Sequence, residues 1–269
     1  MVRNNGIEVA GADFATMVAS YLLNPGTRQH NLDALTFAEL GHEKITKDDL
    51  LGTGREKITF PEVEAEKLSL YSCEDADFTN RLVAKLEKGL REQDLVKLFR
   101  EMEMPLVIVL SEMEDKGIKI DVKFLEKIRK EATWAIEKLE AKIKKMAGMD
   151  FNINSTHQLK EVLFEKLGIP TLGIAKTKTG ISTAAEELEK LRDVHPIIRL
   201  IQEHRELSKL LNTYISALPE LINEKTGRIH TSFNQAVTAT GRLSSTEPNL
   251  QNIPIRTELG REIRKAFVA

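Results

Sequence analysis

The chain has 269 residues, of which 41% are hydrophobic and 30% charged, and its formal net charge at pH 7 is −2. This length suits one large domain or two smaller ones, and the charge balance does not decide on a nucleic-acid partner, because a basic patch can lie on one face. The single cysteine, Cys73, excludes an internal disulfide framework and favours a reducing, cytoplasmic compartment. No apolar run approaches the roughly 20 residues of a membrane helix, so we expect neither export nor a membrane partner.

The first hundred residues are predicted to be helical and compact. Apolar residues recur at helical spacing over 13–23, and a second short helix is expected over 31–40. One or two further helices are expected over 62–90, with Pro61 in the first turn. Strand candidates are few in this region, so its pattern favours a mainly α fold.

The middle of the chain opens with an apolar helical stripe that begins at Pro105 and ends before Gly117. Residues 118–121 alternate like a short strand, and a long, heavily charged helix is predicted over 122–146. Two ion pairs of the favourable i,i+4 orientation are expected along that helix: Glu126 with Lys130, and Glu140 with Lys144.

The following region is predicted to alternate helices with one loop. A polar cap at 154–156 precedes a helix over 158–167, and the Gly/Lys/Thr-rich stretch 173–183 is expected to be an exposed, mobile loop. Helices are then predicted over 184–192 and 197–211. A strand is expected over 227–233.

Residues 235–269 are unusually rich in short polar side chains with arginines among them. Such donors suit a ligand with many acceptors, and DNA presents acceptors as phosphate oxygens and as base atoms of the minor groove. A polar loop that caps its own backbone would have the same composition. The candidate DNA-binding residues are Thr240, Arg242, Asn249, Gln251, Asn252 and Arg256.

The run Thr238–Ser245 (TATGRLSS), continued by Pro248–Pro254 (PNLQNIP), resembles the sequence of family A DNA polymerases, the bacterial DNA polymerase I type, just before their first palm carboxylate motif. The resemblance implies that Arg242 reaches into the minor groove at the primer terminus. It also implies that Asn249, Gln251 and Asn252 line the primer–template. Minor-groove acceptors occur on all correctly paired bases, so such contacts test pair geometry without reading sequence.

Residues 205–214 are similar to the thumb of the same family. Arg205, Lys209 and Thr213 fall at i, i+4 and i+8 of a predicted helix, which places them on one face. A basic stripe with a hydroxyl group can follow DNA phosphates. An ordinary solvated helix face would show the same spacing.

The stretch Tyr71–Asp75 (YSCED) resembles the third 3′–5′ exonuclease motif of the family, in which the tyrosine orients the attacking water and the aspartate binds metal. A two-metal nuclease needs several converging carboxylates, so Asp75 is expected to form only an incomplete metal site, with Tyr71 and Asp75 an inactive catalytic remnant. Asp13, Glu74 and Asp77 are candidate substitute ligands, although solvated helix carboxylates are the more ordinary interpretation.

The resemblance covers the whole chain and implies a mainly α fold with short strands (α+β). A partial ribonuclease H-like exonuclease domain would occupy 1–100, a helical polymerase thumb 105–225, and the start of the palm 226–269. The parent enzyme would be a DNA-directed DNA polymerase (a nucleotidyltransferase) that uses Mg²⁺ in replication and repair. Because the palm aspartates lie outside this sequence, we expect it to bind no Mg²⁺ stably and to need the remaining palm and fingers.

Two alternatives to primer–template binding stay open at this point. The chain could retain a weak metal-dependent 3′–5′ exonuclease activity through Asp75 and recruited carboxylates. It could also be a structural piece of a split polymerase that is active only with its missing partner.

Overall fold

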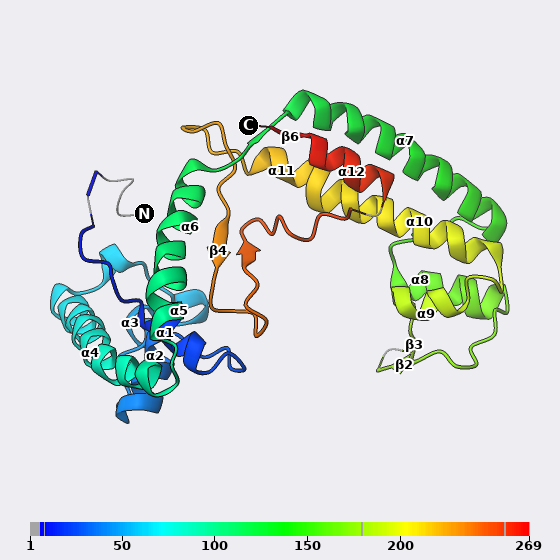
Figure 1. Ribbon diagram of the computed structural model, residues 1–269. Helices are drawn as coiled ribbons and strands as arrows, with labels where there is room; N and C mark the ends of the chain where they lie inside the picture. Colours follow the sequence, from blue (N-terminus) through cyan, green and yellow to red (C-terminus); the bar gives the residue numbers. More distant parts are fainter. Residues whose placement is uncertain (1–5, 8, 179, 256, 269) are drawn as a thin grey trace. The chain divides into compact units, whose positions relative to one another are not determined.

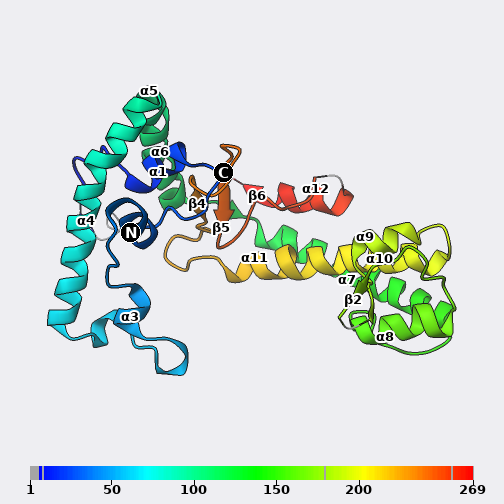
Figure 2. The same ribbon diagram turned by 90° about the horizontal axis from the view of Figure 1, so that it is seen from below.

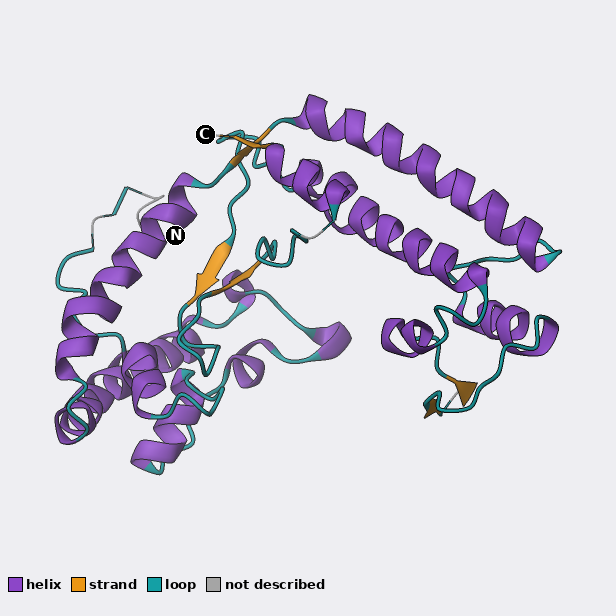
Figure 3. Ribbon diagram, turned by 45° about the vertical axis from the view of Figure 1, so that its right-hand side comes forward, coloured by secondary structure: helices purple, strands orange, loops and turns teal. Residues whose placement is uncertain are grey.

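The computed structural model describes residues 6–7, 9–178, 180–255 and 257–268. Helices make up most of the structure, and the strands of the described residues pair only in twos (Figure 3). This confirms the predicted mainly α fold with short strands. No helix among these residues is long and apolar enough to cross a membrane. The chain divides into two compact units: Met1–Gly117 with His230–Gln251, and Ile118–Ile229 with Asn252–Ala269.

The described residues of the first unit form six α-helices and one strand pair (Figure 1). Their bounds are α1 Thr16–Leu23, α2 Leu32–Leu35, α3 Lys47–Leu51, α4 Ala65–Glu92, α5 Val96–Leu98, α6 Met104–Lys116, β4 Ser232–Asn234 and β5 Ser244–Thr246. Two π-helical turns, Thr36–Leu40 and Phe99–Glu103, continue α2 and α5. Pro61 lies in a separate 3₁₀ turn, so α4 begins later than predicted, as one uninterrupted helix.

The core of the first unit forms where α4 packs against α1. Phe78, Leu82, Leu86 and Leu90 recur every four residues along α4 and are buried. This spacing keeps them on one side of the helix, where the last three join a cluster that includes Val18 of α1. The opposite side of α4 carries the charged residues that the sequence interleaves with this stripe.

The second unit contains the remaining helices and two strand pairs. Their bounds are β1 Lys119–Ile120, α7 Val122–Ala147, α8 Thr156–Lys160, β2 Lys176–Thr177, β3 Gly180–Ile181, α9 Ala185–Lys190, α10 Pro196–Leu210, α11 Ala217–Glu220, α12 Glu258–Lys265 and β6 Phe267–Val268. Two π-helical segments, Glu161–Lys166 and Leu211–Ser216, continue α8 and α10. The antiparallel pairs are β1 with β6 and β2 with β3.

The long helix α7 lies beside α10, and α8, α9 and the β2–β3 hairpin gather at one end of this pair (Figure 2). The carboxylate of Asp121 accepts a hydrogen bond from the Phe124 amide at 2.9 Å, which caps the start of α7. Gly148, at φ 66°, ends it in the left-handed conformation that glycine adopts freely. A partly buried hydrogen bond of 3.0 Å between His204 Nε2 and Glu140 Oε1 joins α10 to α7.

Three local expectations differ from the structure. Glu126 accepts two hydrogen bonds from Arg129, one residue before the predicted partner Lys130. In the same way Glu140 bonds to His204, and Lys144 pairs with Asp150 at 2.7 Å instead of with Glu140. Within the stretch predicted as an exposed loop, β2 pairs with β3, and Ser182 and Thr183 are buried. A residue of another helix, His204, explains the partner of Glu140, whereas the partners of Glu126 and Lys144 are nearby in the sequence.

Candidate nucleic-acid interface

The polar segment, residues 235–251, begins directly after β4 and contains β5, the second strand of the pair in the first unit. Asn234 is paired with Ser244, so the two strands bring the ends of the intervening turn together. The backbone amide of Phe233 in β4 donates a hydrogen bond of 2.6 Å to the Glu114 carboxylate of α6. The turn is therefore held on a short strand pair that is itself fixed to a helix.

Two further hydrogen bonds fix the polar segment to helices of the same unit. The buried phenol of Tyr21 in α1 donates from Oη to the carbonyl oxygen of Thr238 at 2.7 Å. The amide Nε2 of Gln235 donates to the carbonyl oxygen of Glu103 at 3.0 Å. Bonds of this kind contribute about 1 kcal/mol each, which is enough to favour one conformation of a short turn.

Several polar side chains of the segment bond to its own backbone. Asn249 Oδ1 accepts from the Gln251 amide at 3.0 Å, and Gln251 Nε2 donates to the carbonyl of Leu243 at 2.8 Å. The hydroxyl of Thr238 donates to the carbonyl of Arg242. The self-capping alternative is thus correct for these contacts, which shape the segment and still leave Asn249 and Gln251 exposed.

Thr240 and Arg242 lie at the exposed turn of the segment. They flank Gly241, which has φ 76° and so allows the chain to reverse at this point. The arrangement presents a guanidinium and a hydroxyl donor outward on an anchored turn. Asn252 is exposed and belongs to the second unit, and Arg256 lies outside the described residues.

Of the three residues predicted to lie on one helix face, one is bonded to another part of the protein and two are exposed. Arg205 is half-buried, and its Nη1 donates to the carbonyl oxygen of Thr183 at 2.5 Å. Burial lowers the pKa of its guanidinium, which stays charged at neutral pH. Lys209 is exposed in α10, and Thr213 is exposed in the π-helical segment that follows.

A surface hollow between α9 and α10 surrounds Arg205 and Lys209, and its charges are mixed. Arg192 pairs within it with Glu189 at 2.9 Å. The acidic neighbours Glu203 and Glu206 line the same hollow. The basic stripe is therefore narrower than the spacing of Arg205, Lys209 and Thr213 alone suggested.

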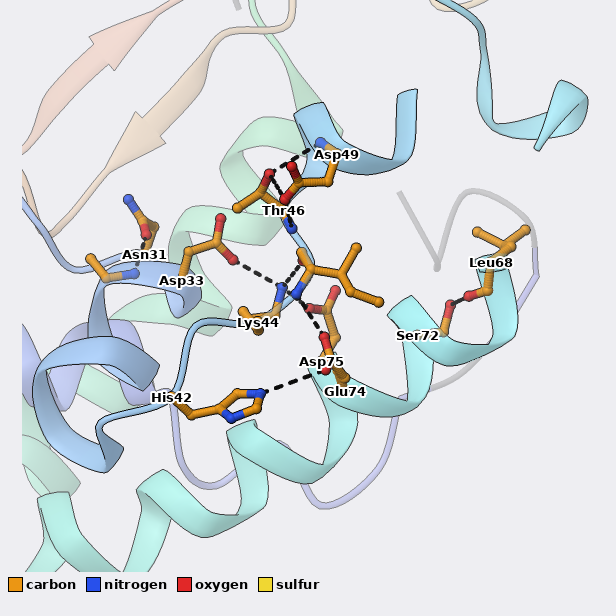
Figure 4. A network of polar contacts seen from close by, with 12 residues as sticks. Asn31, Asp33, His42, Lys44, Thr46, Asp49, Leu68, Ser72, Glu74 and Asp75 are labelled. Carbon is orange, nitrogen blue, oxygen red and sulfur yellow. Dashed lines mark hydrogen bonds and ion pairs between the residues drawn. The ribbon is translucent and has the colours of Figure 1, made fainter. Parts of the chain in front are cut away.

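The motif residue Asp75 of α4 lies next to the buried Lys44 (Figure 4). Tyr71 precedes Asp75 by four residues in α4, which places both on one face of the helix. Lys44 Nζ is 2.7 Å from Asp75 Oδ1 and 2.9 Å from Asp33 Oδ1. It also lies 4.8 Å from the centre of the Tyr71 ring. Burial first, and then the charge of Asp75, raise the pKa of the Tyr71 phenol.

Local structure explains why Lys44 is held there. Gly41 adopts the left-handed conformation and ends the π-helical turn that follows α2. Beyond Gly41 the chain leaves the helix direction and runs along α4. The hydroxyl and backbone of Thr46 then form a reciprocal capping box with Asp49, which fixes the start of α3. Between these two points Ile45 donates its amide to Glu74 Oε2 at 2.8 Å, so this strip of chain lies against α4.

Comparison with known sequences decides the family. Residues 122–269 match the profile described as DNA polymerase family A, which is more than half of the chain. The chain belongs to DNA polymerase family A. Residues 1–91 of this family A chain match a second profile, described as 3′-5′ exonuclease.

The relatives of this family A chain are bacterial. It is 47% identical over 270 residues to DNA polymerase I of Chloroflexus aurantiacus, covering 98% of this chain and 28% of the relative. It is 42% identical over 269 residues to DNA polymerase I of Bacillus subtilis, covering 99% of this chain and 30% of the relative. The chain thus spans less than a third of the length of either relative.

A solved structure shares the fold of the family A chain. The POL domain of Pol1 from M. smegmatis, in complex with DNA primer-template and dNTP, matches with a TM-score of 0.79 and 36% sequence identity. The match covers 99% of this chain and 43% of that one.

The exonuclease resemblance implies a metal ion at Asp75, and the side chains around Asp75 do not fit one. The ammonium of Lys44, with a side chain only 1% exposed, already lies within ion-pair distance of Asp75. Glu74 is turned to the Ile45 amide, and Asp77 pairs with Arg81 at 2.7 Å. Across the described residues no group of three or more His, Cys, Asp or Glu side chains is placed to hold a metal ion.

Sequence reasoning missed Lys44, Asp33 and Tyr21. Lys44 and Asp33 lie in irregular chain or a short helix, where no periodicity marks them, and only acidic residues were considered as partners of Asp75. Tyr21 was counted only as a member of an apolar helix stripe. Its phenol was the available signal, because a buried tyrosine hydroxyl usually needs a hydrogen-bond partner.

Proposed function

We propose that this chain is the part of a family A DNA polymerase that grips primer–template DNA during template-directed DNA synthesis. The observation that carries the proposal is the polar segment, in which exposed Arg242 and Thr240 stand on a turn fixed by Tyr21 and Gln235. An anchored turn loses little conformational freedom when its donors meet a ligand, which favours binding.

The donors of this turn suit the minor groove near a primer terminus. The minor-groove edge carries acceptors on every correctly paired base, so an arginine there senses pair geometry and not sequence. We assign this role to Arg242, with Thr240, Asn249, Gln251 and Asn252 as further contacts to the duplex. Arg256 is kept as a candidate from its place in the sequence motif.

The second surface that we assign to DNA is the α10 face. Lys209 and Thr213 are exposed and would meet phosphates, whereas Arg205 would act partly by holding Thr183 in place. The domains we propose are exonuclease-like (1–100), thumb (105–225) and the start of the palm (226–269). The whole enzyme would add the remaining palm and the fingers, use Mg²⁺, and act in replication and repair in the cytoplasm.

The test is fluorescence anisotropy of a labelled primer–template titrated with the 269-residue chain and with Arg242→Ala. We expect the substitution to weaken binding by about tenfold, the effect typical of one base-edge arginine. Arg55→Ala, which removes another exposed arginine of the first unit, is the matched control and should leave the affinity unchanged.

Titrations at about 50 and 200 mM salt separate electrostatic binding from other causes. Each phosphate contact steepens the log–log salt dependence by about 0.9. Salt-sensitive binding that only Arg242→Ala weakens supports the proposal. Equal effects of Arg242→Ala and Arg55→Ala, or no binding at the lower salt, would contradict it.

A further inference from the structure

The most enclosed charge among the described residues of the first unit is the ammonium group of Lys44. Three oxygen atoms surround Nζ: Asp75 Oδ1 at 2.7 Å, Ile45 O at 2.8 Å and Asp33 Oδ1 at 2.9 Å. The Tyr71 ring closes a further side at 4.8 Å. Lysine is almost never fully buried unless it is paired, and here it has a partner in nearly every direction.

The oxygen set around Lys44 is the kind that a hard cation takes. Two carboxylates and one backbone carbonyl are typical ligands of Ca²⁺ or Mg²⁺, which they hold at roughly 2.0–2.6 Å. Around Nζ, instead, Ile45 O and Asp33 Oδ1 accept hydrogen bonds, and Asp75 Oδ1 lies at ion-pair distance. The chain therefore supplies its own positive charge to a pocket of oxygens.

We propose that the Lys44 ammonium takes the place of a divalent cation at Asp75, so that the exonuclease-like region is held together without a metal ion. This inference is independent of DNA binding by the polar segment. It gives Asp75 a structural role and removes it from the ligands available to a nuclease. A divalent ion beside Nζ would meet a like charge at about 3 Å, which strongly disfavours it even at an effective dielectric constant near 20.

Comparison with an ordinary surface ion pair of the same unit shows how strongly the Lys44 side chain is buried. Lys57 and Asp48 are 3.8 Å apart, with side chains 46% and 65% exposed. Lys44 is 1% exposed and contacts two carboxylates, those of Asp33 and Asp75, which are 46% and 35% exposed. The lysine, and not the carboxylates, is enclosed, as expected for a cation at the centre of its ligands.

The first test is Mn²⁺ binding, followed by electron paramagnetic resonance of free Mn²⁺ during titration of the full chain. We expect the same uptake by the wild-type chain and by Asp75→Asn, because Asp75 is already occupied by Lys44. Uptake by the wild-type chain that Asp75→Asn abolishes would overturn the inference. Lys57→Ala, which removes an exposed ammonium, is the matched control and should not change Mn²⁺ uptake.

The second test removes the internal cation. Lys44→Ala should take up about one more Mn²⁺ per chain than the wild type, and the ion should raise its Tm, because a ligand of the native state stabilises it. The double variant Lys44→Ala/Asp75→Asn should lose this uptake. An unchanged uptake by folded Lys44→Ala would contradict the inference.

If Lys44→Ala does not fold, the inference is tested by comparing the Tm of the wild-type chain in EDTA with its Tm in Mg²⁺. Equal values support a region that needs no metal ion. A Tm that falls in EDTA, and that Asp75→Asn makes insensitive to EDTA, would overturn the inference.

Discussion

The Lys44 cluster (Lys44, Asp33, Asp75 and Tyr71) and the polar segment belong to the same compact unit and use polar side chains in opposite ways. In the cluster, the buried ammonium of Lys44 pairs with the partly exposed carboxylates of Asp33 and Asp75, so these charges find their partners within the protein. In the polar segment, the internal bonds fix the backbone while Arg242 stays exposed. The difference teaches that a motif carboxylate such as that of Asp75 is available to an external ligand only if no neighbouring side chain already pairs with it.

The largest effect is expected from Lys44→Met, which removes the positive charge and leaves Asp33 and Asp75 facing each other. Breaking a buried pair typically costs 3–5 kcal/mol, and the partial exposure of the carboxylates reduces this to about 2–3 kcal/mol. Urea unfolding followed by circular dichroism measures the loss. Lys57→Met is the control, with an expected loss below about 0.5 kcal/mol. Equal losses in the two variants would remove the distinction between the cluster and an ordinary surface pair.

Alkaline pH should weaken the same cluster. Burial lowers the pKa of Lys44, but its bonds to Asp75 and Asp33 outweigh burial and raise the pKa above the ordinary 10.5. Because the pKa is raised on folding, this stabilisation is complete below 10.5 and is lost as the pH rises through the folded-state value. The difference in unfolding free energy between the wild type and Lys44→Met should therefore be constant from neutral pH up to pH 10.5 and decrease above it. A difference that is constant up to about pH 12 would contradict the shift.

A smaller effect is expected from Tyr21→Phe, which removes the hydroxyl bonded to Thr238 and loosens the polar segment. A lost hydrogen bond of about 1 kcal/mol corresponds to a roughly fivefold weaker affinity for primer–template, with an unchanged salt slope because no charge is removed. Tyr214→Phe, at a buried tyrosine of the second unit, is the control in the same anisotropy assay. A wild-type affinity for Tyr21→Phe would show that the segment needs no support from α1.

The smallest effect is expected on α10, where one side chain is tethered and its neighbour is not. Lys209→Ala should reduce the salt slope of DNA binding by about 0.9 without changing the urea midpoint. Arg205→Ala should also lower the urea midpoint, because it leaves the buried Thr183 carbonyl without this donor. Identical behaviour of the two variants would mean that the tether to Thr183 is irrelevant.

The sequence was sufficient for features with a local cause. The apolar pattern over 122–146 predicted α7 almost to its observed end at Ala147. The polymerase motif around Arg242 identified the family, which the comparison confirmed. The assignment of individual residues to DNA remains a prediction until binding is measured.

Contacts between residues distant in the sequence could not be predicted. Lys44 reaches Asp75 across 31 positions, and Tyr21 reaches Thr238 across 217. Neither residue has a spacing that marks its partner, because such pairs depend on how helices pack. The i,i+4 prediction for Glu140 and Lys144 failed for the same reason, since His204 of another helix competes for the carboxylate.

Hydrogen–deuterium exchange of the chain with and without primer–template DNA tests the contrast between the two regions in one experiment. The account predicts that DNA slows amide exchange in residues 235–251, and that it leaves the amides around Lys44 and Asp75 unchanged. Slower exchange around Lys44 and Asp75, with none in residues 235–251, would contradict the account.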